Sequence, residues 1–341
     1  MRRSFLATVL ALAVALAACG GGGDDETEKK AEPKNEEEVV AVAPLTGLPD
    51  LDDTAQTRPA LTVKVDNICE PGGQCVRPQT GVDQADVVYE EVTEGGITRF
   101  TAIFQSQVPP EVGPIRSVRA IDPDLVAAIG GVFAYSGGAG PNVEKVRQAP
   151  VNAIDENAAG DAMFRNDAKE APHNLFGRPQ ALFDKGGQPV PPPPLFEYLA
   201  EGEVFAGETV TSFRVGFRPG YAPNYAYDAA TRTWKRDIDG VPFTMSNLAQ
   251  IAPTNVIVQF TQYTGGGEGN VIGEGVAWIF SDGKLIRGTW SRAAREETIK
   301  YFDAAGQPVK LLPGSTWVEL LPNLSPVDLV GPPPAPATPS T

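Results

Sequence analysis

The chain carries one long apolar run at its start and, after residue 44, a succession of short runs with the periods of strands and helices. In the first half, runs rich in apolar, β-branched and aromatic residues predict strands. These runs cover residues 60–66, 86–93, 98–105 and 132–136. Asp122-Pro123 is an N-cap followed by proline and predicts a helix over residues 123–129, and a second helix is predicted over residues 141–148. Residues 45–205 are therefore predicted to form an α/β domain.

The second half has the pattern of a mainly β structure. Strand-like runs cover residues 211–217, 255–262, 276–281 and 284–290. Asp282-Gly283 lies between the last two runs and is a strong signal for a two-residue hairpin turn. Pro191–Pro194 predicts an extended connection before this half. The predicted fold class is α+β, an N-terminal α/β domain followed by a mainly β C-terminal domain over residues 206–326.

The apolar run at the start is typical of a secretory signal peptide and not of a membrane span. It follows Met1-Arg2-Arg3, covers residues 5–18, and is shorter than the roughly 20 apolar residues that a transmembrane helix needs. It ends in Leu16-Ala17-Ala18-Cys19, a small-residue cleavage site followed by cysteine. The motif predicts a signal peptide over residues 1–18 and lipidation of Cys19. The protein is therefore expected to be extracytoplasmic and lipid-anchored to the cell membrane.

Two further segments have compositions that do not build a core. Residues 19–44 combine a run of glycine with many Asp, Glu and Lys residues, which predicts a flexible acidic tether behind the lipidated cysteine. Residues 327–341 are rich in proline and small residues, which predicts a disordered tail.

The charge of the chain restricts its partners. The formal net charge is −15 at pH 7, and removing residues 1–18 takes away two arginines, which gives −17 for the mature protein. Because such a surface repels polyanions, nucleic acid is excluded as a general partner. A local cationic pocket is still compatible with this charge, since charges further apart than about 8 Å are largely screened at physiological salt.

Cys69 and Cys75 remain as an even pair once Cys19 carries lipid. In an oxidising compartment they are expected to form a disulfide, whose short loop contributes about 2 kcal/mol in the chain-entropy model. A metal site is the alternative for this pair, but no second cysteine or histidine pair accompanies it. No metal site and no cofactor are predicted.

Seven motifs in order after the tether resemble the YerB family of bacterial lipoproteins. They are Pro44–Leu48, Arg77–Gly81, Ala85–Glu90, Glu94–Phe100, Gly113–Arg119, Pro172–Phe176 and Pro313–Trp317. The resemblance covers nearly all of the chain after the tether. It implies a two-domain extracytoplasmic lipoprotein whose biochemical activity is not settled. The loop over residues 69–75 is an addition to the family pattern.

Three arginines form the strongest candidate site. Arg99 opens a predicted strand, and Arg116 and Arg119 precede the predicted helix, whose N-terminus favours negative charge. Gly137 and Gly138 follow a strand at the edge where α/β sheets usually bind ligands. Together these residues are candidates for binding an anion. The alternative is that the arginines pair internally with acidic residues, namely Glu90, Glu91 and Glu94.

An enzyme that modifies the cell wall or handles phosphate is the catalytic alternative for the same arginines. The order of strands, aspartates and arginines is similar to that of the LytR-CpsA-Psr phosphotransferases, which implies Asp66 or Asp86 as a metal-binding acid. His173 is the one histidine of the chain, so a serine or cysteine nucleophile with a histidine base has to use it. Its alternative role is to pack or hydrogen-bond a loop.

Aromatic residues in the second half have two interpretations, a sugar- or peptide-binding face or core packing. They are Tyr221, Tyr225, Tyr227, Trp234 and Trp290. Taken together, the sequence favours a noncatalytic binding protein of the cell envelope, attached to the membrane through lipid. Its expected ligand is a cell-wall component or an envelope protein.

Overall fold

The computed structural model describes residues 41–50, 54–70, 72–186, 190–265 and 267–330. The predicted signal peptide, the lipidation of Cys19, most of the predicted tether and residues 331–341 of the predicted tail lie outside the described residues. Val42 already pairs with Pro49, and Ala43 is buried, so packed structure is present before residue 44, where the tether was predicted to end.

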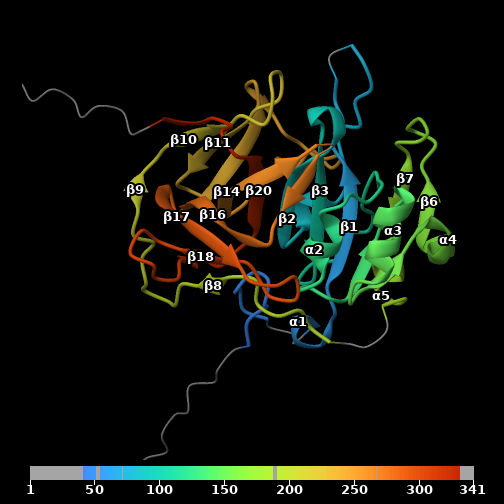
Figure 1. The fold of residues 1–341 in the computed structure, drawn as a ribbon, viewed down its shortest axis with the longest axis horizontal. Helices are drawn as coiled ribbons and strands as arrows, with labels where there is room; N and C mark the ends of the chain where they lie inside the picture. The colour runs from blue at the N-terminus through green and yellow to red at the C-terminus, as the bar shows by residue number, and fades with distance from the viewer. Residues whose placement is uncertain (1–40, 51–53, 71, 187–189, 266, 331–341) are drawn as a thin grey trace, which may run out of the picture. The chain divides into compact units, whose positions relative to one another are not determined.

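A large mixed sheet is the centre of the described structure and contains residues of both predicted domains (Figure 1). Within the described residues it has twelve strands, with the main order β18-β17-β16-β14-β20-β2-β3-β1-β4-β5, while β15 pairs with β14 and β9 with β17. The strands are β1 (Leu61–Asp66), β2 (Val87–Val92), β3 (Thr98–Phe104), β4 (Val132–Ala134), β5 (Asn152–Ile154), β9 (Glu208–Thr209), β14 (Asn255–Thr264), β15 (Glu268–Asn270), β16 (Gly273–Ser281), β17 (Lys284–Arg292), β18 (Lys300–Phe302) and β20 (Thr316–Pro322). The two halves join where β2 and β20 pair in parallel.

A small sheet of five strands within the described residues packs on one face of the large sheet. Its strands, in order, are β13 (Val241–Pro242), β12 (Thr233–Ile238), β11 (Pro223–Asp228), β10 (Ser212–Val215) and β21 (Val327–Val330). Phe213 at its centre stacks on Phe280 of the large sheet, with 3.6 Å between ring centroids. Because β21 pairs with β10, residues 327–330 are ordered strand and not the beginning of a disordered tail.

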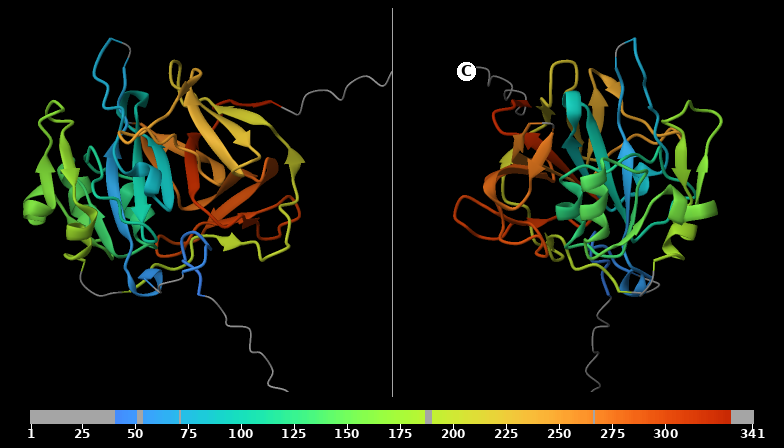
Figure 2. Two further views of the ribbon diagram at one scale, coloured as in Figure 1. Left: turned by 180° about the vertical axis from the view of Figure 1, so that it is seen from behind. Right: turned by 45° about the vertical axis from the view of Figure 1, so that its right-hand side comes forward.

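Short helices cover the first half of the large sheet. On one face, α2 (Asp122–Val126) and α3 (Gly140–Arg147) pack against Phe133, while α5 (Pro179–Phe183) packs on the other face (Figure 2). The remaining short elements are α1 (Thr54–Thr57), η1 (Val82–Gln84), η2 (Glu94–Gly96), α4 (Glu156–Ala159), η3 (Gly160–Ala162), β6 (Met163–Arg165), β7 (Leu175–Gly177), β8 (Glu197–Tyr198) and β19 (Lys310–Leu311). The helix predicted over residues 123–129 ends at Val126, because Gly130 and Gly131 turn the chain into β4 with positive φ. No helix of the described chain is long and apolar enough to cross a membrane.

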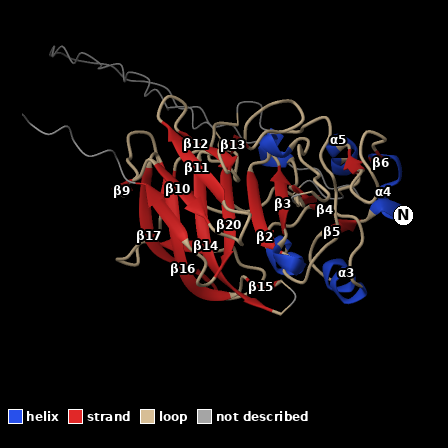
Figure 3. Ribbon diagram, turned by 90° about the horizontal axis from the view of Figure 1, so that it is seen from above, coloured by secondary structure: helices blue, strands red, loops and turns tan. Residues whose placement is uncertain are grey.

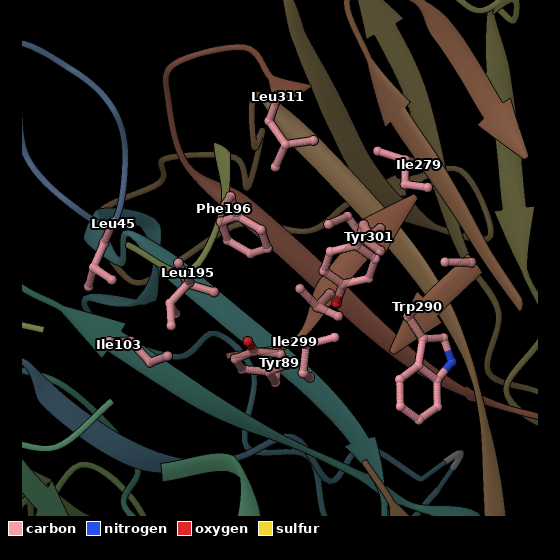
Figure 4. Packing of buried hydrophobic residues seen from close by; sticks show 14 of the residues in the cluster. Leu45, Tyr89, Ile103, Leu195, Phe196, Ile279, Trp290, Ile299, Tyr301 and Leu311 are labelled. Carbon is pink, nitrogen blue, oxygen red and sulfur yellow. The ribbon is translucent and has the colours of Figure 1, made fainter. Parts of the chain in front are cut away.

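The core confirms the predicted fold class, an α/β first half and a mainly β second half. Tyr89 and Ile103 of the first half pack in one cluster with Leu195, Trp290 and Tyr301 of the later chain (Figure 4). The predicted hairpin joins β16 to β17, and Asp282 and Gly283 both have positive φ, 50° and 68°. These are the angles that a two-residue type I′ turn requires.

The second-half aromatics singled out as a binding face belong mainly to the interior. Tyr221, Tyr225, Trp234 and Trp290 are buried, and Tyr227 packs against the same core as Trp234. The core-packing interpretation is therefore right for these residues. Tyr225, Tyr227 and Trp234 belong to the small sheet and pack between the two sheets with Tyr221, while Trp290 packs in the cluster of Tyr89 and Tyr301.

Candidate functional site

The site is built at the edge of the large sheet where β1 and β2 end. Asp66, the last residue of β1, lies opposite Arg99 of β3, which in turn lies opposite Glu91 of β2. Beyond the end of β4, the segment 113–116 pairs with the edge of β1 in its place, and Arg116 N donates to Lys64 O (2.8 Å). Since β1, β2 and β4 run in the same direction, this is the carboxyl edge, at which open α/β sheets usually bind ligands.

Arg116 belongs to a chain of polar contacts that includes the single histidine. Its Nε lies 2.9 Å from Asp66 Oδ2, and His173 Nδ1 lies 2.6 Å from the same oxygen. His173 Nε2 lies 2.8 Å from Oε1 of Gln74, a residue of the loop closed by Cys69 and Cys75. The predicted disulfide is confirmed, and its loop projects from the end of β1 in Figures 1 and 2. The loop therefore contacts the candidate site through Gln74.

Arg99 lies behind the other two arginines and is only 8% exposed. One of its terminal nitrogens, Nη1, donates to Ser117 O (2.7 Å), while its buried Nε has no hydrogen-bond partner within the described structure. Burial, together with the neighbouring charges of Arg119 and Arg116, lowers the pKa of Arg99 to about 10, although Asp66 and Glu91 act to raise it. Three guanidinium groups thus converge, and we call Arg99, Arg116 and Arg119 the arginine cluster.

Arg119 is the outer member of the arginine cluster. Its Nε donates to Glu94 Oε2 (2.7 Å), and its Nη1 donates to Val118 O (2.9 Å). The side chain of Glu94 is 58% exposed, so this ion pair is accessible to solvent. Of the acidic residues predicted as internal braces, Glu94 takes this role directly. Glu91 pairs with Lys64, and Glu90 bonds to Arg236.

The end of α2 does not contribute to the site as predicted. The helix has only five residues, and Asp122 at its start already accepts from Arg119 N (2.6 Å) and from Lys64 Nζ (2.7 Å). This carboxylate occupies the position that the sequence assigned to a ligand anion.

Gly137 and Gly138 lie against the backbone of the arginine cluster. Val118 N donates to Gly137 O (3.0 Å), so Gly137 offers a carbonyl to the protein. A Cβ at Gly138 would lie 2.7 Å from the side chain of Val118. These glycines allow the two segments to approach, which positions Arg116 and Arg119.

Asp66 and Asp86 do not form one metal site. Asp66 ends β1, whereas Asp86 precedes β2 at the opposite edge of the sheet, where it accepts from Gln105 N (2.6 Å) and Ser106 N (2.8 Å). Burial raises the pKa of Asp86 to about 6 despite these bonds. No group of three metal-ligating side chains is present in the described ranges.

Comparisons with known proteins match both halves of the described chain. The model of the N-terminal domain of DUF3048, described as a protein of unknown function, matches residues 45–188, and the model of its C-terminal domain matches residues 213–318. The chain belongs to the DUF3048 family. It is 28% identical over 303 residues to "Putative lipoprotein YerB" of Bacillus subtilis, covering 83% of this chain and 86% of that protein.

The crystal structure of YerB from Bacillus subtilis has a similar fold. It gives a TM-score of 0.72 at 25% identity, and the match covers 84% of this chain and 99% of that chain. The resemblance indicated by the sequence motifs is thereby confirmed. In this DUF3048 chain the conserved fold therefore carries the arginine cluster at the junction of β1, β2 and β3.

Sequence reasoning missed two buried cations of this DUF3048 chain, Lys64 and Arg236. Lys64 lies two positions before Asp66 in β1, so the two side chains face the same side of the sheet. The sequence contained a signal for this buried cation: Lys64 lies inside an otherwise apolar strand, and a lysine in such a strand is seldom buried without an acidic partner. The partners of Arg236 come from distant segments and gave no local signal.

Proposed function

We propose that this chain is a membrane-anchored extracytoplasmic lipoprotein, a noncatalytic binding protein of the cell envelope. In this proposal the arginine cluster holds an anionic group, phosphate or carboxylate, of a wall component or a partner protein. The convergence of three guanidinium groups on an acidic protein is the observation that carries the proposal: Nη1 of Arg99 and Nη1 of Arg119 both donate to Ser117 O (2.7 and 3.4 Å), and Arg116 precedes that serine. The lipid anchor is supported by the motif that ends at Cys19 and by the name of the Bacillus subtilis relative.

The free donors of the arginine cluster suit an oxyanion. Arg119 donates Nε to Glu94, whereas Arg116 Nε lies 2.9 Å from Asp66 Oδ2 without forming a hydrogen bond; the two side chains are 16% and 21% exposed. Neither terminal nitrogen of Arg116 has a hydrogen-bond partner within the described structure, and Arg119 Nη2 has none either. A guanidinium with free terminal N–H groups binds phosphate or carboxylate through two parallel bonds.

Glu94 is the counter-ion that a ligand has to displace. Exposed ion pairs contribute only about 0–1 kcal/mol, so a ligand anion that bonds to two or three guanidinium groups competes effectively with it. Asp66 behaves differently, because it is buried and held by both Arg116 and His173. We therefore assign Asp66 to positioning Arg116 and Glu94 to pairing with Arg119 until a ligand anion replaces it.

This assignment gives two opposite expected results. Arg119→Ala should weaken the binding of phosphate or pyrophosphate about tenfold or more, because a hydrogen bond to a charged group is worth about 1.5–3 kcal/mol. Glu94→Ala should strengthen it, because the competing carboxylate is gone. Titration calorimetry of the full chain with phosphate, pyrophosphate and wall fragments measures both.

Arg214→Ala is the control, because Arg214 forms an exposed pair with Asp239 on the small sheet, away from the cluster. The proposal is wrong if the parent protein binds none of the three ligands. It is equally wrong if Arg119→Ala, still folded, binds them as the parent does.

A wall-modifying or phosphate-handling enzyme is the second candidate function. The favouring observation is the 2.6 Å contact between Asp66 and His173, since a carboxylate that orients an imidazole is a recurrent arrangement for proton transfer. Phosphorus NMR of the same pyrophosphate samples distinguishes the two functions. Conversion of pyrophosphate to phosphate by the parent but not by His173→Gln supports the enzyme, whereas bound and intact pyrophosphate supports the binding protein.

Replacement of the lipid-bearing cysteine tests the anchor. Cys19→Ala is expected to remove lipid and to release the protein from the membrane fraction, while residues 41–330 keep their fold because their core does not include Cys19. Fractionation of cells and circular dichroism of the released protein measure the two parts. Retention of the variant on membranes after a high-salt wash would contradict the anchoring role of Cys19.

A further inference from the structure

The small sheet covers only part of the large sheet. Strands β14, β16 and β17 have 9–10 residues, while the strands of the small sheet have at most six. Val258 and Phe280 lie under the small sheet. Two residues further along β14, Phe260 is only partly buried, and Val276 of β16 is half exposed. Figure 3 shows β15, which continues this end of the sheet, well away from β11, β12 and β13.

The uncovered part of this face forms a groove with an aromatic floor, which we call the aromatic groove. It has an open volume of about 540 Å³ and is lined by Phe260 and Trp278, with Gln262, Asn270, Glu274 and Asn323 among its polar residues. Sites for small ligands have volumes of about 300–1,000 Å³, and a few polar groups in them fix the ligand. The volume and the lining therefore match a small-molecule site.

The two aromatic rings of the groove floor contact each other, and Arg287 lies over one of them. Trp278 meets Phe260 edge to face, with 5.8 Å between ring centroids. The guanidinium of Arg287 lies 4.9 Å from the centroid of Trp278 and is itself paired with Glu208 at 2.7 Å. Because Arg287 is paired with Glu208, the floor presents an aromatic surface without a free cation.

The polar residues of the aromatic groove are available to a ligand. Gln262, Glu274 and Asn323 are exposed, and their side chains make no hydrogen bond within the described residues. Asn270 accepts from Ile272 N (3.0 Å) through Oδ1, which leaves its NH₂ group. Side-chain amides offer both donors and acceptors, the combination that pairs with hydroxyl groups.

We propose that the aromatic groove binds a neutral oligosaccharide. A sugar ring has apolar C–H faces that pack on aromatic rings and hydroxyl groups at its edge that bond to amides. The alternative of an anionic ligand is disfavoured by Glu274 and by the net charge of −15. This site is separate from the arginine cluster and does not depend on the proposed function.

Binding of neutral oligosaccharides to the full chain tests the inference. Chitotriose, cellotriose and maltotriose are titrated while tryptophan fluorescence and heat are recorded. At least one should bind, and Trp278→Ala should weaken that binding about tenfold, in line with the 0.5–1.5 kcal/mol of a specific aromatic contact added to its buried area. Gln262→Ala, which changes an exposed side chain and should fold normally, should weaken it severalfold.

Gln307→Ala is the matched control, because Gln307 is an exposed amide outside the aromatic groove whose side chain makes no hydrogen bond in the described structure. It should bind as the parent does. Arg119→Ala should also bind the sugar normally, which separates this site from the anion site. The inference is overturned if the parent binds none of the three sugars, or if Gln262→Ala and Trp278→Ala both bind as tightly as Gln307→Ala while folded.

Discussion

Arg236→Ala should destabilise the protein by about 3–5 kcal/mol, the usual cost of removing one partner of a buried ion pair. Arg236 is fully buried between the two sheets, and its Nη2 donates to Glu90 Oε2 (2.6 Å) and to Tyr221 OH (2.9 Å). Its guanidinium lies 4.6 Å from the ring centroid of Trp317 and 4.8 Å from that of Phe243. The alanine variant loses these contacts and leaves Glu90 as an unpaired buried charge.

A second buried acid, Glu319, lies beside the same cation, with 3.6 Å between Arg236 Nη1 and Glu319 Oε1. Burial and the nearby Glu90 raise the pKa of Glu319 well above its usual value, against the lowering effect of Arg236. Burial also acts to raise the pKa of Glu90, but Arg236 and the hydrogen bonds to Glu90 bring it below its usual value. Arg236 is therefore the charged residue that holds the pKa of Glu90 below its usual value.

Urea unfolding measures this effect. The double variant Arg236→Ala with Glu90→Gln should recover part of the lost free energy of unfolding, because no unpaired charge is then buried. Arg214→Ala is the control, since Arg214 is half exposed and its ion pair with Asp239 is long, at 3.6 Å. If Arg236→Ala costs no more than Arg214→Ala, the buried pair does not stabilise the packing of the two sheets.

Lys64→Met is expected to have the second large effect, also about 3–5 kcal/mol. Lys64 is fully buried beneath the arginine cluster and is the cation for two buried acids, Glu91 and Asp122. Its Nζ also donates to Thr101 Oγ1 (2.9 Å). Methionine fills similar volume, so the destabilisation reports the two carboxylates left without their cation.

The effect of Lys64→Met depends on pH. Burial and Asp122 raise the pKa of Glu91 to about 7, against the lowering effect of Lys64. The folded protein therefore holds a proton on Glu91 that the unfolded chain has already released between about pH 4.5 and 7. This contribution to stability is complete at low pH and is lost as the pH rises through that window.

Removing Lys64 raises the pKa of Glu91 further, so the destabilisation should be larger at pH 8 than at pH 5. Unfolding at the two pH values measures it. Lys310→Met is the control, because Lys310 forms an exposed pair with Glu203 and should show little change at either pH. An equal loss at pH 5 and pH 8 would mean that Glu91 is not the acid that Lys64 compensates.

The sequence predicted the local elements better than the contacts between them. The strands over residues 61–66, 87–92 and 98–104 follow from their apolar patterns, and the hairpin at Asp282-Gly283 follows from the turn chemistry. Alternation within a strand, however, does not specify its neighbour. The pairing of β2 with β20 joins residues more than 200 positions apart, and no local pattern encodes it.

The candidate site was predictable only in part for the same reason. Arg116 and Arg119 lie in one short motif, and Arg99 follows a nearby hairpin. Their proximity could therefore be predicted from the sequence. His173 meets Asp66 across 107 positions, through a segment whose register is set by β7. The end of α2 was misjudged because the carboxylate of Asp122 has Lys64 and Arg119 as partners, which only the fold brings near.

The position of β20 has a consequence for how this protein reaches its folded state. β20 lies between β14 and β2 in the large sheet, yet it is almost the last strand of the chain. The first half of the chain therefore leaves the ribosome with the edge of β2 still open, and an open edge favours pairing with other chains. The large sheet is complete only when β20, residues 316–322, pairs with β2 and β14. The two family domains therefore share one sheet and form one folding unit, which is completed late in the chain.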